Sequence, residues 1–284
     1  MIKIVTDSTC DLTPESIEKY GIHVEPMLVE IDGVTYRDGI EMTRDKFFDG
    51  LPRFRDIPKT AACSPGSLLE AYRAAHRAGA TGILSVHISA RLSGVCAAAN
   101  IAAEDARAEG IDVRVVDSMS LSMGLGYLLE LAGEMREKGA TLAEIGDALD
   151  AKRLEIRMYA LIDTLTYLRK GGRVSNLSAF VGELLKIKPL VHVKDGLITT
   201  IDKARTRSQG IDRMFEDAVR FAAGRKVLSA SIMHSTGPIE RDLQDMASRI
   251  RTLWGIEPVA PRVVTPIIGT HTGPAGLGLV VILA

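Results

Sequence analysis

Two serines and a glycine mark the boundary between an apolar segment and an alanine-rich one. The segment SARLSG (residues 89–94) follows GILSVHI and precedes VCAAAN. The free amides of a helix start, with hydroxyls nearby, bind anions, and Gly94 lets a ligand approach the backbone beside Ser93. Ser93 and Gly94 therefore indicate a site for a carboxylate or a phosphate, although such a pair alone is a weak signal.

Polar residues follow other apolar segments in the same way. They are Asp7 to Thr9, Asp117 with Ser118, and His234 with Ser235. Ligands of open α/β sheets bind beyond the carboxyl ends of the strands, so these residues are candidates for one shared crevice. For any one of them a helix cap is the commoner role, and Ser64 beside Pro65 is interpreted as a cap first.

A histidine between two threonines, in IGTHTGP (residues 268–274), is the best candidate for a titrating side chain. A glycine-rich segment of this kind is unusual in a packed core, so His271 is expected to serve a functional site. His87 and His192 lie inside apolar segments and are interpreted as core histidines with hydrogen-bonded rings.

Two basic segments could supply a cation to an anionic ligand. LRKGGR (residues 168–173) places Arg173 beside a glycine turn, and a second segment contains Lys203, Arg205 and Arg207. A guanidinium can hold a carboxylate through two parallel hydrogen bonds. A solvated basic loop is the competing interpretation for both segments.

The sequence gives no support for nucleotide or nucleic-acid binding. It has no GxxxxGK[ST] motif, and Gly124-Leu125-Gly126 lacks the third glycine of a dinucleotide-binding fingerprint. Its 35 Lys and Arg balance 36 Asp and Glu, so it lacks the excess positive charge that binds a phosphate backbone. The expected partner is a small molecule or another protein.

The three cysteines, Cys10, Cys63 and Cys96, are too few and too scattered to form a disulfide framework or a zinc site. We interpret them as reduced core residues. MIKIVTDST lacks the features of a signal peptide, and no apolar segment reaches the length of a membrane span. A cytoplasmic protein without a metal or stable membrane insertion is expected.

The elements that must position these residues fall into two predicted domains. Over residues 1–155, β-branched segments alternate with helix-period segments, which predicts an α/β domain with a parallel sheet. Residues 22–63 are less regular and are predicted to be an insert or flap. Residues 156–284 are predicted to form an α+β domain with antiparallel strands. A chain of 284 residues can hold two such domains.

Short motifs predict where several elements begin or turn. Thr13 and Ser64 each precede a proline and are predicted helix caps. Asp-Gly pairs at residues 32–33 and 195–196 predict two hairpins. Other predicted elements are strands at residues 2–6, 82–88, 113–117, 227–234 and 278–283, and helices at 65–80, 95–110, 175–186 and 238–254.

Seven short motifs, in order along the whole chain, resemble the DegV family, the fatty-acid-binding subunits of bacterial fatty acid kinase. They are VTDSTCDL, the Lys59-Thr60 segment before Ser64-Pro65, SARLSG, VVDS, LRKGGRVS, DKARTRSQG and GTHTGPAGLGL. The family pattern has T-S-Q-P after the lysine and S-S-G-L-S-G at the serine loop. Residues 61–63 and 90–91 depart from this pattern, whereas Thr60 and Ser93 keep it.

The resemblance implies a long-chain fatty acid in an apolar tunnel between or within the two domains. Its carboxylate would be bound by the Ser93 hydroxyl and nearby amides, including that of Gly94, with Thr60 assisting. Arg173, His271 and Thr272 match family positions near the carboxyl end. There a separate ATP-dependent kinase subunit would phosphorylate the fatty acid to an acyl phosphate for phospholipid synthesis. The resemblance implies no cofactor and no catalytic residue in this chain.

Two other functions are compatible with the same residues. One is a serine hydrolase that acts on acyl esters through Ser93, His271 and an aspartate such as Asp7, although no GxSxG motif is present. The other is a kinase subunit that holds a small carbonyl substrate covalently on a histidine, as the dihydroxyacetone kinases do. The acyl chain length, the degree of saturation, the oligomeric state and the kinase partner are not encoded in any recognisable motif.

Overall fold

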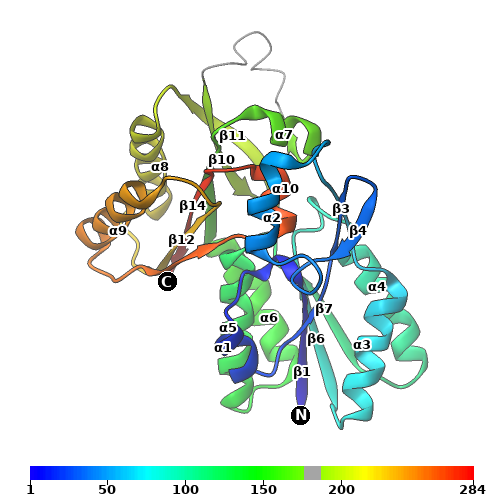
Figure 1. The fold of residues 1–284 in the computed structure, drawn as a ribbon. Coiled ribbons are helices and arrows are strands. Elements are labelled where there is room, and N and C mark those ends of the chain that lie inside the picture. The colour runs from blue at the N-terminus through cyan, green and yellow to red at the C-terminus, as the bar shows by residue number, and fades with distance from the viewer. Residues whose placement is uncertain (176–186) are drawn as a thin grey trace.

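A computed structural model describes residues 1–175 and 187–284 of the chain (Figure 1). The first half of this described part contains a parallel sheet with strand order β2-β1-β6-β7. Its strands are β1 (Ile2–Asp7), β2 (His23–Glu25), β6 (Gly82–His87) and β7 (Val113–Asp117). Every residue of β6 is buried, as expected for a parallel strand covered on both faces.

Helices cover both faces of the parallel sheet, α3 and α4 on one side and α1, α5 and α6 on the other (Figure 1). They are α1 (Pro14–Lys19), α3 (Pro65–Arg77), α4 (Val95–Ala108), α5 (Met123–Glu137) and α6 (Leu142–Lys152). The side chains of Thr13 and Ser64 cap α1 and α3 by accepting from backbone amides, which confirms both predicted helix starts.

Residues 22–63, predicted to be an insert, lie only partly outside the parallel sheet. Its first residues form β2, which pairs with β1 and so belongs to the parallel sheet. The rest forms a small antiparallel sheet, β4-β3-β5, with the hairpin turn at Asp32-Gly33 as predicted. Its elements are β3 (Leu28–Ile31), β4 (Val34–Arg37), α2 (Arg44–Gly50) and β5 (Lys59–Ala61). This sheet carries Thr60 toward the C-terminal half.

The second half of the described chain contains a mostly antiparallel sheet with strand order β13-β12-β14-β8-β10-β11-β9. The strands are β8 (Ile156–Leu161), β9 (Val174–Ser175), β10 (Lys188–Lys194), β11 (Leu197–Ala204), β12 (Val227–His234), β13 (Val259–Val263) and β14 (Leu277–Leu283). The Asp195-Gly196 hairpin joins β10 and β11 as predicted. The outer pairs β12–β13 and β11–β9 are parallel, so the predicted antiparallel sheet is mixed at its edges.

The helices of this half are α7 (Leu165–Gly171), α8 (Arg207–Ala222), α9 (Glu240–Trp254) and α10 (Pro266–Thr272). Short 3₁₀ turns lie at Ser8–Cys10, Leu51–Arg53 and Arg153–Glu155. No element was predicted from the sequence at β8, α7, β9, α10 or β13. The helix predicted from about Ser175 to Lys186 lies outside the described residues, apart from Ser175, which is in β9.

Alternation along β8 assigns the two faces of the C-terminal sheet to different cores. Tyr159 and Leu161 pack with α8 and α9, whereas Met158 packs with the core that continues into the N-terminal half. The two sheets therefore share one continuous apolar layer. The domain boundary near residue 155 stays a prediction, and the change of sheet type falls between β7 and β8.

Candidate functional site

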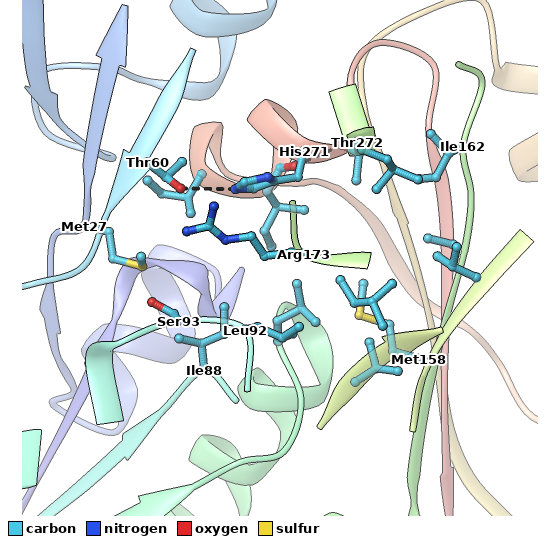
Figure 2. Close-up of a pocket in the computed structure, with 18 of the residues that line it drawn as sticks. Met27, Thr60, Ile88, Leu92, Ser93, Met158, Ile162, Arg173, His271 and Thr272 are labelled. Atoms are coloured by element: carbon cyan, nitrogen blue, oxygen red, sulfur yellow. Dashed lines mark hydrogen bonds between the residues drawn. The ribbon is translucent and has the colours of Figure 1, made fainter. Parts of the chain in front are cut away.

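A cavity of about 940 Å³, including its opening to solvent, lies where the two sheets and the small antiparallel sheet meet (Figure 2). Most of its lining is aliphatic: Met27, Ala61, Ala62, Ile88, Leu92, Leu121, Met158, Ala160, Ile162, Leu168, Val191, Val193, Ile198, Ile267 and Ile268. Among the described lining residues none is acidic. The cavity is therefore suited to a mainly hydrocarbon ligand.

The six residues that the family resemblance assigns to the ligand all line this one cavity. Ser93 and Gly94 come from the loop before α4, Thr60 from β5, His271 and Thr272 from α10, and Arg173 from the segment after α7. Figure 2 shows Ser93, Thr60, His271 and Arg173 grouped in one part of the cavity, with Met158 and Ile162 in another part. Ile88 and Leu92 lie beside Ser93 in the same part, and Thr272 lies near Ile162.

The loop before α4, where an anion site is predicted, has hydrogen-bond donors without a capping partner. Gly94 is the N-cap residue of α4 and makes no side-chain cap, so the first amides of this helix are not satisfied by a capping side chain. Ser93 is half-buried, and its hydroxyl has no hydrogen-bond partner within residues 1–175 and 187–284. A carboxylate placed here would find a hydroxyl donor and helix amides together.

Thr60 and His271 meet across the cavity, with 3.1 Å between Thr60 Oγ1 and His271 Nε2 (Figure 2). Burial, and secondarily the charge of Arg173, lowers the pKa of His271 from 6.5 to about 4. The imidazole is therefore neutral at pH 7. His271 lines the cavity, but it does not titrate near neutral pH as expected from the sequence.

Gly171, the last residue of α7, makes room for the imidazole. A methyl group at Gly171 would lie 2.2 Å from His271 Nδ1. That nitrogen is buried and has no hydrogen-bond partner among the described residues. The glycine of the LRKGGR motif is thus a packing requirement for the histidine of the GTHTGP motif.

Arg173 is exposed on one side and reaches the cavity on the other. Its Nη1 donates to the Gly171 carbonyl oxygen at 2.7 Å, which leaves its other nitrogens available. The second basic segment does not line the cavity. Arg207 instead donates to Asp242 at 2.6 Å and to Asp163 at 3.2 Å.

Thr272 lies on the same face of α10 as Ile268 and donates its hydroxyl to the Ile268 carbonyl oxygen at 3.2 Å. The Ser235 hydroxyl lies 3.3 Å from the Thr272 hydroxyl. Thr272 also borders a smaller apolar cavity that His234 and Ser235 help to line. A direct contact between Thr272 and a carboxylate stays a prediction.

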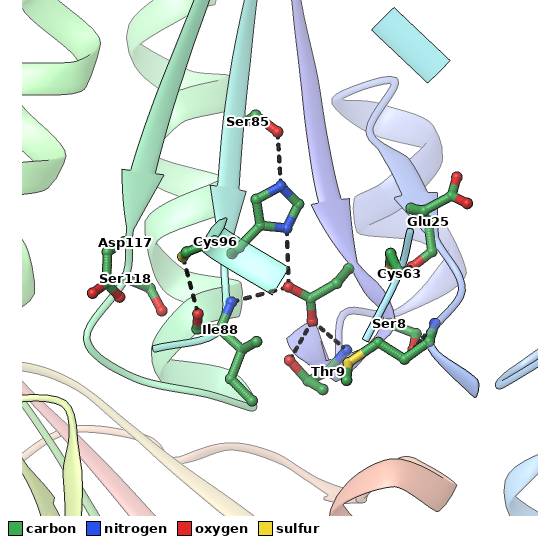
Figure 3. Close-up of polar contacts among 12 residues, drawn as sticks. Ser8, Thr9, Glu25, Cys63, Ser85, Ile88, Cys96, Asp117 and Ser118 are labelled. Carbon is green, nitrogen blue, oxygen red and sulfur yellow. Dashed lines mark hydrogen bonds and ion pairs between the residues drawn. The ribbon is translucent and has the colours of Figure 1, made fainter. Parts of the chain in front are cut away.

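The predicted hydrolase triad is not assembled. The Asp7 carboxylate is buried and lies 3.1 Å from Nδ1 of His87, a different histidine, while His271 pairs with Thr60. Ser85 Oγ completes this chain at 2.7 Å from His87 Nε2. Ser85, His87 and Asp7 are all fully buried, so this serine is not accessible to a substrate (Figure 3).

The chain from Ser85 to Asp7 supports the end of β6. His87 has both ring nitrogens paired, which confirms its interpretation as a satisfied core histidine. Asp7 also accepts from the Ile88 amide at 2.9 Å, and hydrogen bonds from these neighbours lower its pKa despite burial. His192 is less well satisfied, because its Nδ1 lies 3.6 Å from the Asp217 carboxylate, and burial lowers its pKa.

Asp11 was not singled out from the sequence, although it holds α10 in place. Its carboxylate accepts from the Thr265 amide at 2.9 Å, from Arg44 at 3.3 Å and from the Ser122 hydroxyl. Burial raises the pKa of Asp11. Nothing local in the sequence distinguishes this aspartate from a cap, because its partners come from three distant segments.

The three cysteines are buried and form no disulfide bond with one another. Burial raises the pKa of each thiol. In the described part of the chain no group of His, Cys, Asp and Glu side chains could hold a metal ion. No helix there is long and apolar enough to cross a membrane.

The fold and the cavity together define an α/β protein with a small-molecule site between a parallel and a mixed sheet. The chain belongs to the DegV family, because the model of that family, described as "Uncharacterised protein, DegV family", matches residues 1–284. A DegV domain-containing protein of Streptomyces coelicolor is 35% identical over 281 residues, which cover 99% of this chain and 98% of that protein.

Solved structures of other members have the same fold. A Thermus thermophilus DegV family protein, described with fatty acid binding, is 30% identical and superposes with a TM-score of 0.87, covering 100% of this chain and 99% of that one. A stearic acid-binding protein from Eubacterium ventriosum is 25% identical with a TM-score of 0.89, covering 100% and 98%.

Proposed function

We propose that this protein binds one long-chain fatty acid in the cavity and presents its carboxylate to a separate kinase subunit. One observation carries the proposal: a single, largely aliphatic cavity has its free hydroxyl, helix amides and arginine gathered in one part. The Thermus thermophilus and Eubacterium ventriosum relatives, described as binding a fatty acid and stearic acid, support this ligand class.

The hydrocarbon chain supplies most of the affinity. Burying a methylene is worth roughly 0.8 kcal/mol, so about fourteen methylenes contribute on the order of 11 kcal/mol before ordering costs. The aliphatic lining gives such a chain close contacts and offers it no acidic group. The polar groups then decide which end of the ligand lies near α4.

The carboxylate is expected to accept from the Ser93 hydroxyl and from the first amides of α4, including that of Gly94. With its proton on Nε2, neutral His271 donates to Thr60 Oγ1, and this leaves the Thr60 proton free to point at the carboxylate. These donors offset the several kcal/mol that desolvation of an unpaired carboxylate costs.

Arg173 supports the second part of the proposal because it is exposed and also lines the cavity. A guanidinium there can meet an incoming phosphoryl group and the added charge of an acyl phosphate. This chain would then be a cytoplasmic binding subunit without a cofactor, and the ATP-dependent chemistry would belong to its bacterial kinase partner.

The first experiment is mass spectrometry on the purified protein. Native spectra are expected to show one bound ligand, which denaturation releases as a free fatty acid. A mass increase that survives denaturation would favour a covalently held carbonyl substrate. Ser93-dependent release of p-nitrophenol from an acyl ester would favour a hydrolase. Protein that carries no lipid and takes up none would refute the proposal.

A further inference from the structure

Ser89, four residues before Ser93, makes backbone hydrogen bonds that shape the serine loop, residues 89–94. It is fully buried, and its amide donates to the Ser120 carbonyl oxygen at 2.9 Å. Its own carbonyl oxygen accepts from Leu92 N at 2.9 Å and from Ser93 N at 3.1 Å. The orientation of the turn that ends in Ser93 therefore depends on the position of Ser89.

The side chain of Ser89 is held by the other half of the molecule. Its hydroxyl donates to the carbonyl oxygen of Gly196 at 2.7 Å, in the turn between β10 and β11, and accepts from the Arg91 amide at 3.2 Å. Arg91 Nη1 donates to the Asp195 carbonyl oxygen at 3.3 Å. The loop is thus joined to the hairpin turn by two side-chain bonds.

Gly196 makes this close contact possible. Its φ is +76°, and a methyl group there would lie 2.6 Å from Ser89 Oγ. The hairpin that ends in this turn contributes Val193 and Ile198 to the wall of the cavity. The bonds from Ser89 and Arg91 to the turn therefore link the loop that carries Ser93 to the hairpin against which an acyl chain would pack.

The backbone next to Ser89 is held from the opposite side. Asp7 accepts from the Ile88 amide at 2.9 Å, and His87 steadies Asp7 within a fully buried chain (Figure 3). The Ile88 amide is therefore restrained by the side chain of Asp7 at the end of β1, and the Ser89 amide by the Ser120 carbonyl oxygen. The Ser89 hydroxyl and Arg91 extend that restraint to the hairpin.

We infer that Ser89 is a positioning residue that sets Ser93 relative to the acyl-chain wall by binding the Asp195-Gly196 turn. The inference rests on the proposed function, since it concerns the same carboxylate site. Ser89 is not among the residues that line the cavity. It acts by fixing the position of Ser93 and of the first turn of α4 relative to the hairpin that packs on the hydrocarbon chain.

Two glycine variants test this inference with a matched control. Gly196→Ala places a methyl against Ser89 from the hairpin side. Gly33→Ala makes the same change at the second residue of the other Asp-Gly turn, where φ is +86° and no atom lies within 4 Å of the added methyl. Both variants carry the strain of a left-handed alanine, but only the first displaces Ser89.

The probe is palmitic acid labelled with ¹³C at its carboxyl carbon, added to delipidated protein. Ser89→Ala and Gly196→Ala are expected to shift the bound carboxyl resonance and to weaken binding by about three- to tenfold. Gly33→Ala is expected to lower the melting temperature through backbone strain alone, while leaving the resonance and the affinity as in the wild type.

The same resonance and affinity in Gly196→Ala as in Gly33→Ala would overturn the inference, as would an unchanged resonance in Ser89→Ala. If Ser89→Ala does not fold, the glycine pair still decides the question. A wild-type protein that binds no labelled palmitate would instead refute the proposed function, so the two failures can be distinguished.

Discussion

The imidazole of His271 lies 3.1 Å from the hydroxyl of Thr60, although 211 positions separate the two residues in sequence. Because burial and Arg173 keep His271 neutral, this contact orients a hydroxyl and does not add a positive charge. A carboxylate in this cavity would therefore be bound mainly by neutral donors, with Arg173 as the one described lining residue that carries a fixed charge.

Ser93→Ala should weaken fatty acid binding without unfolding the protein. A hydrogen bond to a charged group is worth about 1.5–3 kcal/mol, which corresponds to a roughly ten- to hundredfold increase in Kd. The measurement is calorimetric titration of delipidated protein with palmitate. Ser64→Ala is the control, since Ser64 also precedes a helix but lies outside the cavity lining. Equal Kd values for wild type and Ser93→Ala would contradict the assigned role.

Gly171→Ala should displace His271, because the added methyl would lie 2.2 Å from its Nδ1. Loss of the Thr60 contact is then expected to weaken palmitate binding several-fold. Gly172→Ala is the matched control, since it strains a backbone with φ +66° but meets no atom within 4 Å. Circular dichroism melts and palmitate titrations of both variants would show whether affinity falls only in Gly171→Ala.

The low pKa of His271 predicts a loss of stability in acid. The unfolded chain takes up this proton near pH 6.5, whereas the folded protein resists until about pH 4. Stability from this group is therefore complete above pH 6.5 and is lost as the pH falls toward 4, by up to about 3 kcal/mol. The free energy of unfolding of the wild type, measured in urea, should decrease by this contribution between pH 7 and pH 4. His271→Gln should lack this part of the decrease. Parallel pH profiles for the two proteins would contradict the prediction.

The raised pKa of Asp38 predicts the opposite dependence of stability on pH. Burial, together with nearby Asp11, raises its pKa from 3.8 to about 7, and the bond from the Ser8 hydroxyl only partly offsets this. The folded protein thus holds a proton that the unfolded chain releases, so stability from this group is lost as the pH rises from about 4 through 7. Asp38→Asn should raise the melting temperature at pH 8 more than at pH 5. Asp56→Asn, at an exposed site, should show no such difference.

Arg173→Ala should spare fatty acid binding and impair phosphorylation by the kinase subunit. The side chain is exposed and makes one bond, to the Gly171 carbonyl oxygen, among the described residues, so its loss removes little packing. The test compares acyl-phosphate formation and palmitate affinity for wild type and variant with the same kinase subunit. Lys194→Ala is an exposed control outside the cavity lining. Equal turnover by wild type and Arg173→Ala would remove this role.

Local signals in the sequence predicted many of the element boundaries. Thr13 and Ser64 cap their helices as expected, and the turns at Asp32-Gly33 and Asp195-Gly196 have the positive φ values that such pairs favour. These features depend on groups within a few residues of one another, so they can be read without the fold. The family motifs also pointed to six residues that line one cavity.

The helix α10 was not predicted from the sequence, although its ends carry local signals. Thr265-Pro266 at its start and Gly273 after its end, with φ +69°, are ordinary helix signals. No helix was predicted for the glycine-rich motif between them. The helix is stabilised by Asp11, a residue 254 positions away, which accepts from the Thr265 amide. That support is invisible in the local sequence.

The amino-acid sequence by itself determined the turns, the caps, the parallel character of the first half and the family, because these follow from neighbouring residues and from short motifs. Only the tertiary structure decided that β14 lies between β12 and β8, that Asp7 pairs with His87, and that the Ser89 loop meets Gly196. Each of those contacts joins segments far apart along the chain. Its partner is selected by the packing of the whole fold, and no local pattern specifies it.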